Sequence, residues 1–387
     1  MRTIITLIAL NLLAVQLYAQ STSIKPVESM LKQLEKIESI SYNQISYDKN
    51  PFGNDTATIY REVTVFFDPN YKLPYADVST TIKDKNYASR TVYADKKIYD
   101  FEKDGTYTTK DYKALRIGNA DIFSDGELQK TVSKIQQTAP DKIKQLNDTT
   151  IDTQNYFYFF VNAFDSVINE QRAFIDMYFA VDKTTFLPKS YTIISKSNYA
   201  ADNNTIELSM HSRSVFSDFN INSRKNYLLN FQIPPGYKPY EKKELLKKGT
   251  PAPEWTGKDM LESTYSSKSF AGKTLLLFMT DISCLGNQLS IGMMNNLTDK
   301  YQNKEVVVLS LFGSSKKELM QYTATNQINF PVIYDAQQIK EKYNAPGAPF
   351  FYIIDKNGYI SYSVYGYTEE RETTLGEELD KALSDKQ

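Results

Sequence analysis

Two patterns of hydrophobic and polar positions divide the chain. Residues 21–240 contain short segments in which apolar and polar residues alternate, the pattern of strands that bury one face of a sheet. From residue 249 onward, apolar runs of strand length alternate with segments of helical period, which is typical of an α/β domain. A charged stretch separates the two parts and follows a group of prolines. We therefore expect a β-rich domain at 21–240, a linker at 241–248 and a second domain at 249–387.

The first of these domains is predicted to combine helices with an antiparallel sheet. One helix is indicated by an apolar stripe at helical spacing, formed by Val27, Met30, Leu31, Leu34 and Ile37. A second helix is expected over Glu127–Thr138. Strand patterns cover the segments around Val63–Phe67, Ser89–Tyr99, Asn155–Ala163, Ala173–Val181, Leu187–Ser195 and Thr205–Phe219. The order predicts an α+β fold in which a curved antiparallel sheet, a half-open barrel, wraps over helices.

The second domain has the more regular pattern. A buried strand is expected before Cys284, and a helix with an apolar stripe follows it, formed by Leu289, Met293, Leu297 and Tyr301. The segment from Ser315 to Glu318 has the spacing of a capping box and predicts the start of another helix. Further strands are expected at Glu305–Phe312 and Gly347–Asp355. The alternation predicts an α/β fold.

Residues 1–20 have the composition of a secretory signal peptide. A positive charge at Arg2 precedes the apolar run Ile4–Leu13, and small or polar residues end the segment near Ala19 and Gln20. The alternative, a membrane anchor, needs about 20 apolar residues, and polar residues interrupt this run. Because the segment contains no cysteine, a lipobox lipoprotein is excluded. We expect an exported protein, periplasmic or extracellular.

The charge balance and the rare residue types narrow the function. Lys and Arg number 45 against 46 Asp and Glu, so the composition gives no indication of nucleic-acid binding. His211 is the only histidine and cannot form a zinc site or a catalytic triad without suitable partners, so we expect no metal and no cofactor. Cys284 is the only cysteine, and it has three possible states in an exported protein: buried, catalytic through a mixed disulfide, or paired in a disulfide-linked homodimer.

The residues around Cys284 carry a resemblance to a known superfamily. Lys248-Gly-Thr-Pro-Ala-Pro253 with Trp255, and Phe270-Ala-Gly-Lys273 before an apolar strand, resemble the peroxiredoxin and TlpA/ResA-like branch of the thioredoxin superfamily. The order of strands and helices from Gly249 onward fits as well. The resemblance implies a thioredoxin-like (redoxin) fold, and it implies that Pro349, after Ala348, is a cis proline lying against the reactive sulfur.

A second, shorter resemblance concerns the first domain. Tyr93-Ala-Asp-Lys-Lys-Ile-Tyr99 and Val181-Asp-Lys-Thr-Thr-Phe-Leu-Pro188 are similar to the periplasmic lipoprotein-carrier (LolA-like) type of domain. That resemblance implies a curved sheet that holds an apolar or lipid-like ligand. A different β-rich accessory domain is the alternative, in which the many aromatic residues simply fill a core.

The chemistry of Cys284 depends on its position and on Asn287. A thiol at a helix N-terminus is stabilised as the thiolate by the helix dipole and by nearby amides. In a complete Cys-x-x-Cys motif the second cysteine resolves the mixed disulfide, but here Asn287 holds that position, so dithiol turnover by this chain alone is excluded. Ser283, in place of an aromatic residue, and Leu285-Gly286 depart from the usual motif, and Asp281 is expected to repel a thiolate.

Two classes of function follow. The first is an exported thioredoxin-like protein with at most a monothiol activity at Cys284, either exchange with a thiol or disulfide protein or reduction of a peroxide. The second is a non-enzymatic binding protein with a degenerate thioredoxin fold, in which the first domain binds an apolar ligand.

Overall fold

The structure is a computed structural model that describes residues 25–52, 55–68, 73–83, 86–118, 122–123, 127–168, 170–201, 204–222, 226–302 and 304–384. The chain forms two compact units, and the main division between them falls between Tyr240 and Glu241. The predicted signal peptide, residues 1–20, lies outside the described residues.

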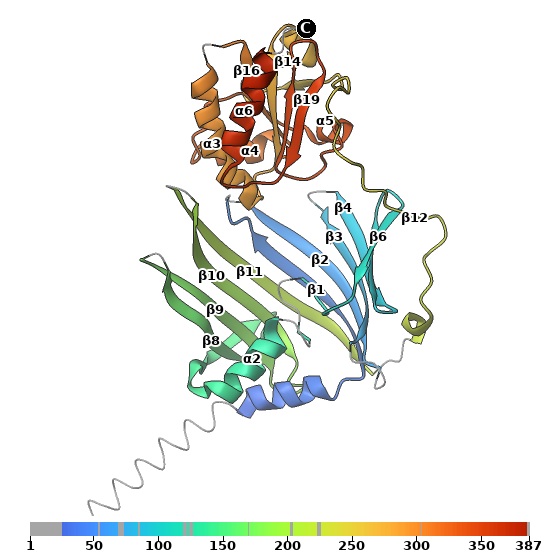
Figure 1. The fold of residues 1–387 in the computed structure, drawn as a ribbon. Helices are drawn as coiled ribbons and strands as arrows, with labels where there is room; N and C mark the ends of the chain where they lie inside the picture. Colours follow the sequence, from blue (N-terminus) through green and yellow to red (C-terminus); the bar gives the residue numbers. More distant parts are fainter. Residues whose placement is uncertain are drawn as a thin grey trace, which may run out of the picture. The chain divides into compact units, whose positions relative to one another are not determined.

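The first unit is built on one long curved sheet (Figure 1). Its strands are β1 (Ser39–Lys49), β2 (Thr56–Phe66), β3 (Tyr75–Ile82), β4 (Tyr87–Ala94), β5 (Lys97–Glu102), β6 (Thr106–Asp111), β7 (Ile143–Ile151), β8 (Gln154–Ile168), β9 (Gln171–Asp182), β10 (Pro188–Ala201), β11 (Asn204–Ile221) and β12 (Lys238–Pro239). The strand order is β12-β6-β5-β4-β3-β2-β1-β11-β10-β9-β8-β7. Neighbours are antiparallel except β12 and β6, which are parallel.

Two helices pack on one face of this sheet and complete its core. The first spans residues 25–35, and the second, α2, spans Glu127–Thr138, the bounds that the sequence predicted. All five residues of the predicted apolar stripe are buried: Val27, Met30, Leu31, Leu34 and Ile37. They share one core with β-strand residues such as Phe159, Phe179 and Phe216. The predicted α+β fold of this unit is confirmed.

Several strands of the first unit lack a clear signal in the sequence. The strand pattern over residues 89–99 contains a turn signal at Asp95–Lys97, and the structure forms the β4–β5 hairpin there, because Asp95 and Lys96 adopt positive φ angles of 51° and 63° and reverse the chain. Strands β1, β3, β6 and β7 were not predicted. In β1 the side chains of Gln44 and Ser46 take inward positions and are buried, so an apolar alternation is missing from its sequence.

The second unit contains a five-stranded mixed sheet in the order β17-β16-β15-β18-β19. Its elements are β13 (Thr256–Lys258), β14 (Thr264–Ser266), β15 (Thr274–Thr280), α3 (Leu285–Tyr301), β16 (Val306–Phe312), α4 (Lys316–Thr323), β17 (Val332–Ile333), α5 (Gln337–Lys342), β18 (Phe350–Ile354), β19 (Ile360–Tyr365) and α6 (Arg371–Ser384). β15, β16 and β17 are parallel, whereas β18 and β19 are antiparallel to their neighbours.

Every residue of the central strand β15 is buried, because helices cover both faces of this sheet. Leu276 and Phe278 join a core with α3, α4 and α6, and the alternate residues of the strand join a core on the other face, which includes Trp255 and α5. The capping box of Ser315 and Glu318 is present and starts α4, as predicted. The α/β fold of this unit is confirmed.

The predicted apolar stripe of α3 needs one correction. Met293, Leu297 and Tyr301 are buried, but Leu289 is only half-buried. The buried face of the helix starts at Asn287 and continues at helical spacing through later residues of the helix. Leu289 therefore lies on the flank of that face.

The expected linker at 241–248 contacts the second unit. The amide of Leu246 donates to the Tyr352 hydroxyl at 3.2 Å, and its carbonyl accepts a hydrogen bond of 2.8 Å from Ser363. Leu245 and Leu246 are partly buried against the same core. Within the part of the chain that the structure describes, no helix has the length and apolar composition needed to cross a membrane.

Candidate functional site

Cys284 lies at the point where the central strand of the second unit turns into a helix. β15 ends at Thr280, and after a short turn Cys284 is the N-cap residue of α3, as the sequence predicted. Its carbonyl accepts hydrogen bonds from the amides of Asn287 at 3.0 Å and Gln288 at 3.3 Å. The thiol is free and partly exposed. It therefore lies at the positive end of the dipole of α3, within reach of solvent.

Pro349 lies beside Cys284. The Ala348–Pro349 peptide bond is cis, as predicted, and the Cys284 Sγ lies 3.5 Å from the Ala348 carbonyl oxygen. Gly286 makes this approach possible, because a Cβ atom at that position would lie 2.8 Å from Pro349 Cδ and 3.6 Å from Cys284 Sγ. The loop before β18 therefore packs closely against the start of α3, and this contact is possible because Gly286, which departs from the common motif, has no Cβ atom.

Asn287 is close to Cys284 in sequence but is completely buried. Its carbonyl oxygen accepts a hydrogen bond of 3.1 Å from Thr280 Oγ1, and its amide donates to the Tyr322 hydroxyl at 3.0 Å. Tyr322 in turn donates to Gln288 Oε1 at 2.8 Å. Burial raises the pKa of Tyr322 to about 12, so the phenol remains neutral at physiological pH. The side chain at the second-cysteine position is therefore part of a structural hydrogen-bond network.

Asp281 has a partner that the sequence analysis missed. The ammonium group of Lys340, on α5, is completely buried and lies 2.6 Å from Asp281 Oδ2. It also donates to the Thr280 carbonyl at 3.1 Å. The expectation that Asp281 simply repels a thiolate is therefore incomplete, because a buried cation balances its charge. A lysine in a short helix is normally exposed, so the sequence held no signal for this pair.

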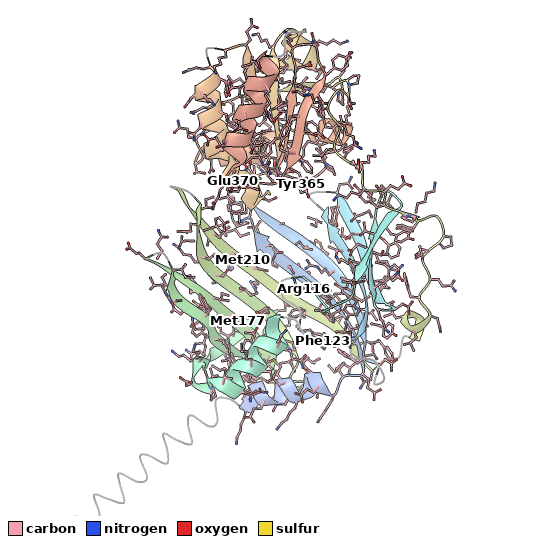
Figure 2. The ribbon with its side chains drawn as sticks, viewed as in Figure 1. Arg116, Phe123, Met177, Met210, Tyr365 and Glu370 are labelled. Carbon is pink, nitrogen blue, oxygen red and sulfur yellow. The ribbon has the colours of Figure 1, made fainter. Side chains whose placement is uncertain are left out.

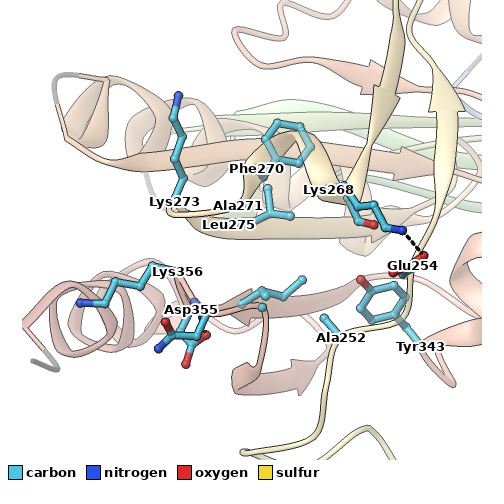
Figure 3. Close-up of a pocket in the computed structure, with 14 residues that line it drawn as sticks. Ala252, Glu254, Lys268, Phe270, Ala271, Lys273, Leu275, Tyr343, Asp355 and Lys356 are labelled. Atoms are coloured by element: carbon cyan, nitrogen blue, oxygen red, sulfur yellow. Dashed lines mark hydrogen bonds and ion pairs between the residues drawn. The ribbon is translucent and has the colours of Figure 1, made fainter. Parts of the chain in front are cut away.

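The pocket in Figure 3 is separate from this site. It has a volume of about 250 Å³, and its lining includes Leu275, Phe270 and Tyr343, with Lys268 and Glu254 forming an ion pair of 3.0 Å. Leu275 pairs with Ile354, at the end of β15 that is remote from Cys284. The pocket therefore takes no part in chemistry at the thiol.

His211 lies exposed on β11. Among the described residues, no group of three or more His, Cys, Asp or Glu side chains is arranged to hold a metal ion.

Comparison with known proteins places the second unit in a class. Residues 248–363 match the AhpC/TSA family. The chain is 28% identical over 148 residues to the thioredoxin-like protein YneN of Bacillus subtilis, and this match covers 37% of this chain and 87% of that protein. It is 24% identical over 129 residues to the thiol-disulfide oxidoreductase ResA of Geobacillus kaustophilus, which covers 33% of this chain and 74% of that protein.

A solved structure is similar over the same part. It is a thiol:disulfide interchange protein of the thioredoxin family from Chlorobium tepidum, 20% identical, covering 36% of this chain and 99% of that chain with a TM-score of 0.31.

The second unit is a thioredoxin-like redoxin domain. Within that superfamily it is of the TlpA/ResA type, as the sequence indicated. These matches cover only the C-terminal part of the chain and give no support to the lipoprotein-carrier resemblance of the first unit.

Proposed function

We propose that this chain carries out monothiol chemistry at Cys284, by exchange with the disulfide or thiol of another protein. The observation that carries the proposal is the position of the partly exposed Sγ at the N-cap of α3, 3.5 Å from the carbonyl that precedes cis-Pro349. The names of the relatives YneN and ResA, a thioredoxin-like protein and a thiol-disulfide oxidoreductase, support this class of reaction.

The first half of the exchange reaction needs only the single thiol of Cys284. The Cys284 thiolate attacks one sulfur of a partner disulfide, a Cys284–partner disulfide forms, and the second partner sulfur leaves as a thiolate. Asn287 has no sulfur and cannot resolve this mixed disulfide. A second thiol from outside the chain, either a small thiol or a protein thiol, must attack the Cys284–partner bond to release Cys284 again.

The geometry supports disulfide exchange over peroxide reduction. Asp281, three residues before Cys284, is engaged by Lys340, and the position offers no hydroxyl to hold a peroxide. Because Cys284 is a single thiol, it also permits an oxidised state in which two copies of the chain form a disulfide-linked homodimer. Non-reducing electrophoresis of the full chain detects such a dimer.

Alkylation of the folded protein tests the proposal. We expect iodoacetamide to modify Cys284 in the native state, with a rate that rises with pH, and glutathione disulfide to add one glutathionyl group detectable by mass spectrometry. Cys284→Ser is the matched control and must abolish both modifications, since the chain has one cysteine. Labelling only after denaturation would contradict the proposal. Rapid consumption of hydrogen peroxide without glutathionylation would instead favour the peroxidase alternative.

A second candidate function is ligand binding by the first unit without catalysis. Phe164 and Ile175 are paired across β8 and β9 and are 41% and 38% exposed, and Met210 on β11 is 39% exposed. Met177 and Phe216, on the same strands and the same face, belong to the buried core. Apolar side chains thus continue beyond the core on the face that carries the helices, which supports binding of an apolar ligand.

We also propose that the chain is exported and consists of a signal peptide at 1–20, a β-rich domain at 21–240 and a redoxin domain at 249–387 joined by residues 241–248. The proposal rests on the composition of the first residues. Mass spectrometry of the secreted protein tests it, with the mature chain expected to begin near Ala19 or Gln20.

A further inference from the structure

A pocket of about 290 Å³ in the first unit contains two arginines and no acidic residue. It lies on the face of β2, β3 and β4 that continues into the core, and the segment before residue 119 closes one side of it. Its lining includes Arg61, Thr80, Ser89, Arg116 and Gly118. Figure 2 labels Arg116 on this side of the sheet.

Arg61 is held in place within this pocket. Its Nη1 donates to Ser46 Oγ at 3.1 Å, and Ser46 also bonds to Ser214 and Gln44 in a buried polar cluster. Gly118 has a φ of +77°, and a Cβ atom there would lie 2.9 Å from Arg61 Cζ, so the guanidinium group packs against the glycine backbone. These contacts fix its position and leave donors of the guanidinium group unused.

The positive charge of Arg61 is not matched by an ion pair. Within the described residues it forms none with a carboxylate; Asp48 attracts it electrostatically, but the Asp48 carboxylate accepts a hydrogen bond from the Ser212 hydroxyl. Burial outweighs that attraction and lowers the pKa of Arg61. Asp100, the carboxylate bonded to Thr91, is paired with Lys110 at 2.9 Å.

Arg116 adds a second cation to the same pocket. Its side chain is exposed, and its backbone is fixed because its carbonyl accepts a 2.6 Å hydrogen bond from the Tyr93 hydroxyl. Around the two guanidinium groups lie hydroxyls, from Thr80 and Ser89 among others, and apolar walls formed by Ile59, Val78, Ile82 and Ile117. Guanidinium groups bind carboxylate and phosphate oxygens with two parallel hydrogen bonds.

We propose that this pocket binds the head group of an amphiphilic anion, with a carboxylate or phosphate on Arg61 and Arg116 and an apolar tail along the exposed part of the same sheet face. The site is independent of Cys284. It rests on the second candidate function, ligand binding by the first unit, and it adds to that function a requirement for negative charge on the ligand.

Fluorescence titration of the full chain with 11-(dansylamino)undecanoic acid tests the proposal. We expect saturable binding, and displacement by oleate or by oleoyl lysophosphatidate but only weakly by oleyl alcohol. Arg61→Gln and Arg116→Gln are each expected to weaken binding about tenfold, since each removes a charge-assisted hydrogen bond. Arg116 is exposed, so its variant keeps the test valid if Arg61→Gln fails to fold.

Arg213→Gln is the matched control, because Arg213 is exposed on β11 between Ser212 and Ser214, which are buried on the other face. This control should bind the probe like the unchanged protein. Preference for oleate or for the lysophosphatidate identifies the head group. Equal binding of oleyl alcohol, with no effect of either pocket substitution, would overturn the anion site and leave apolar ligand binding standing. Failure of every probe to bind would overturn both.

Discussion

At the scale of single residues, Asn287 stands where a second thiol would complete a Cys-x-x-Cys motif. The sequence placed Cys284, Asn287 and Pro349 together through a resemblance, and the structure brings Cys284 and Pro349 into contact. What the sequence did not indicate is that the Asn287 side chain is buried and bonded to Thr280 on strand β15 and to Tyr322 on helix α4. Such a network depends on residues distant in sequence, so local patterns could not predict it.

Asn287→Cys is expected to restore an intramolecular disulfide with Cys284, because the two positions are three residues apart in the first turn of α3. Mass spectrometry should detect the loss of two hydrogens after mild oxidation, and the reduced variant should gain insulin-reductase activity with dithiothreitol. The reduced variant should also be less stable by about 1–3 kcal/mol, since Thr280 and Tyr322 lose their partner.

Ser290→Cys is the control for this prediction. It is buried on the same helix, but it lies too far along α3 for its thiol to reach Cys284. Formation of a disulfide with Cys284 in both variants, or in neither variant, would contradict the prediction.

Lys340→Met is expected to affect both stability and the reactivity of Cys284. It leaves the Asp281 carboxylate without its partner, at a cost of about 2 kcal/mol, which is less than for a fully buried pair because Asp281 is 31% exposed. An unbalanced negative charge near the thiol also disfavours the thiolate, so iodoacetamide labelling should slow several-fold. Urea unfolding and labelling kinetics measure the two effects.

The double substitution Asp281→Asn with Lys340→Met should recover most of the labelling rate, because it removes the unbalanced charge. If the rate remained as slow as in the single variant, Lys340 would act only through packing.

At the scale of elements, Tyr322 links helices α3 and α4. Its hydroxyl accepts from Asn287 and donates to Gln288, and burial raises its pKa to about 12 from 10. The pKa of Tyr322 is higher in the folded state than in the unfolded chain. The stability that the neutral Tyr322 hydroxyl contributes is therefore complete below pH 10 and is lost as the pH rises to 12.

Tyr322→Phe therefore has an effect that depends on pH. At pH 7 we expect a loss of about 1–2 kcal/mol, because Asn287 and Gln288 lose a partner. As the pH rises from 10 to 12 the difference between the two proteins should shrink, which urea unfolding at each pH measures. Tyr365→Phe, at a tyrosine that is 66% exposed, is the control. A difference that stayed constant across this range would refute the linkage.

Elements with strong periodicity could be predicted from the sequence. The first helix, α2 and the capping box of α4 were predicted because local residues determine them. The strands β1 and β6 could not be predicted in this way. In β1 polar residues fill inward positions, and every residue of β6 is at most half-buried, so neither has a clear alternation.

At the scale of the whole molecule, the two units have separate apolar cores, which predicts two unfolding transitions. Leu297→Ala, in the core of the second unit, should lower only one transition, with a cost of about 2–5 kcal/mol. Val132→Ala, in the core of the first unit, should lower only the other. Differential scanning calorimetry measures both. A single transition that moves with either substitution would contradict independent unfolding.

The sequence by itself determined the α/β and β-rich halves and the helix that begins at Cys284, because periodicity and capping residues are local properties of the chain. The cis conformation at Pro349 was implied by the resemblance to the thioredoxin superfamily. Only the tertiary structure decided the electrostatic surroundings. The pairing of Lys340 with Asp281 and the meeting of Arg61 with Gly118 join residues far apart in sequence. Whether each of these charges is balanced depends on which strands and helices pack together. The spacing of residues along the chain does not give that information.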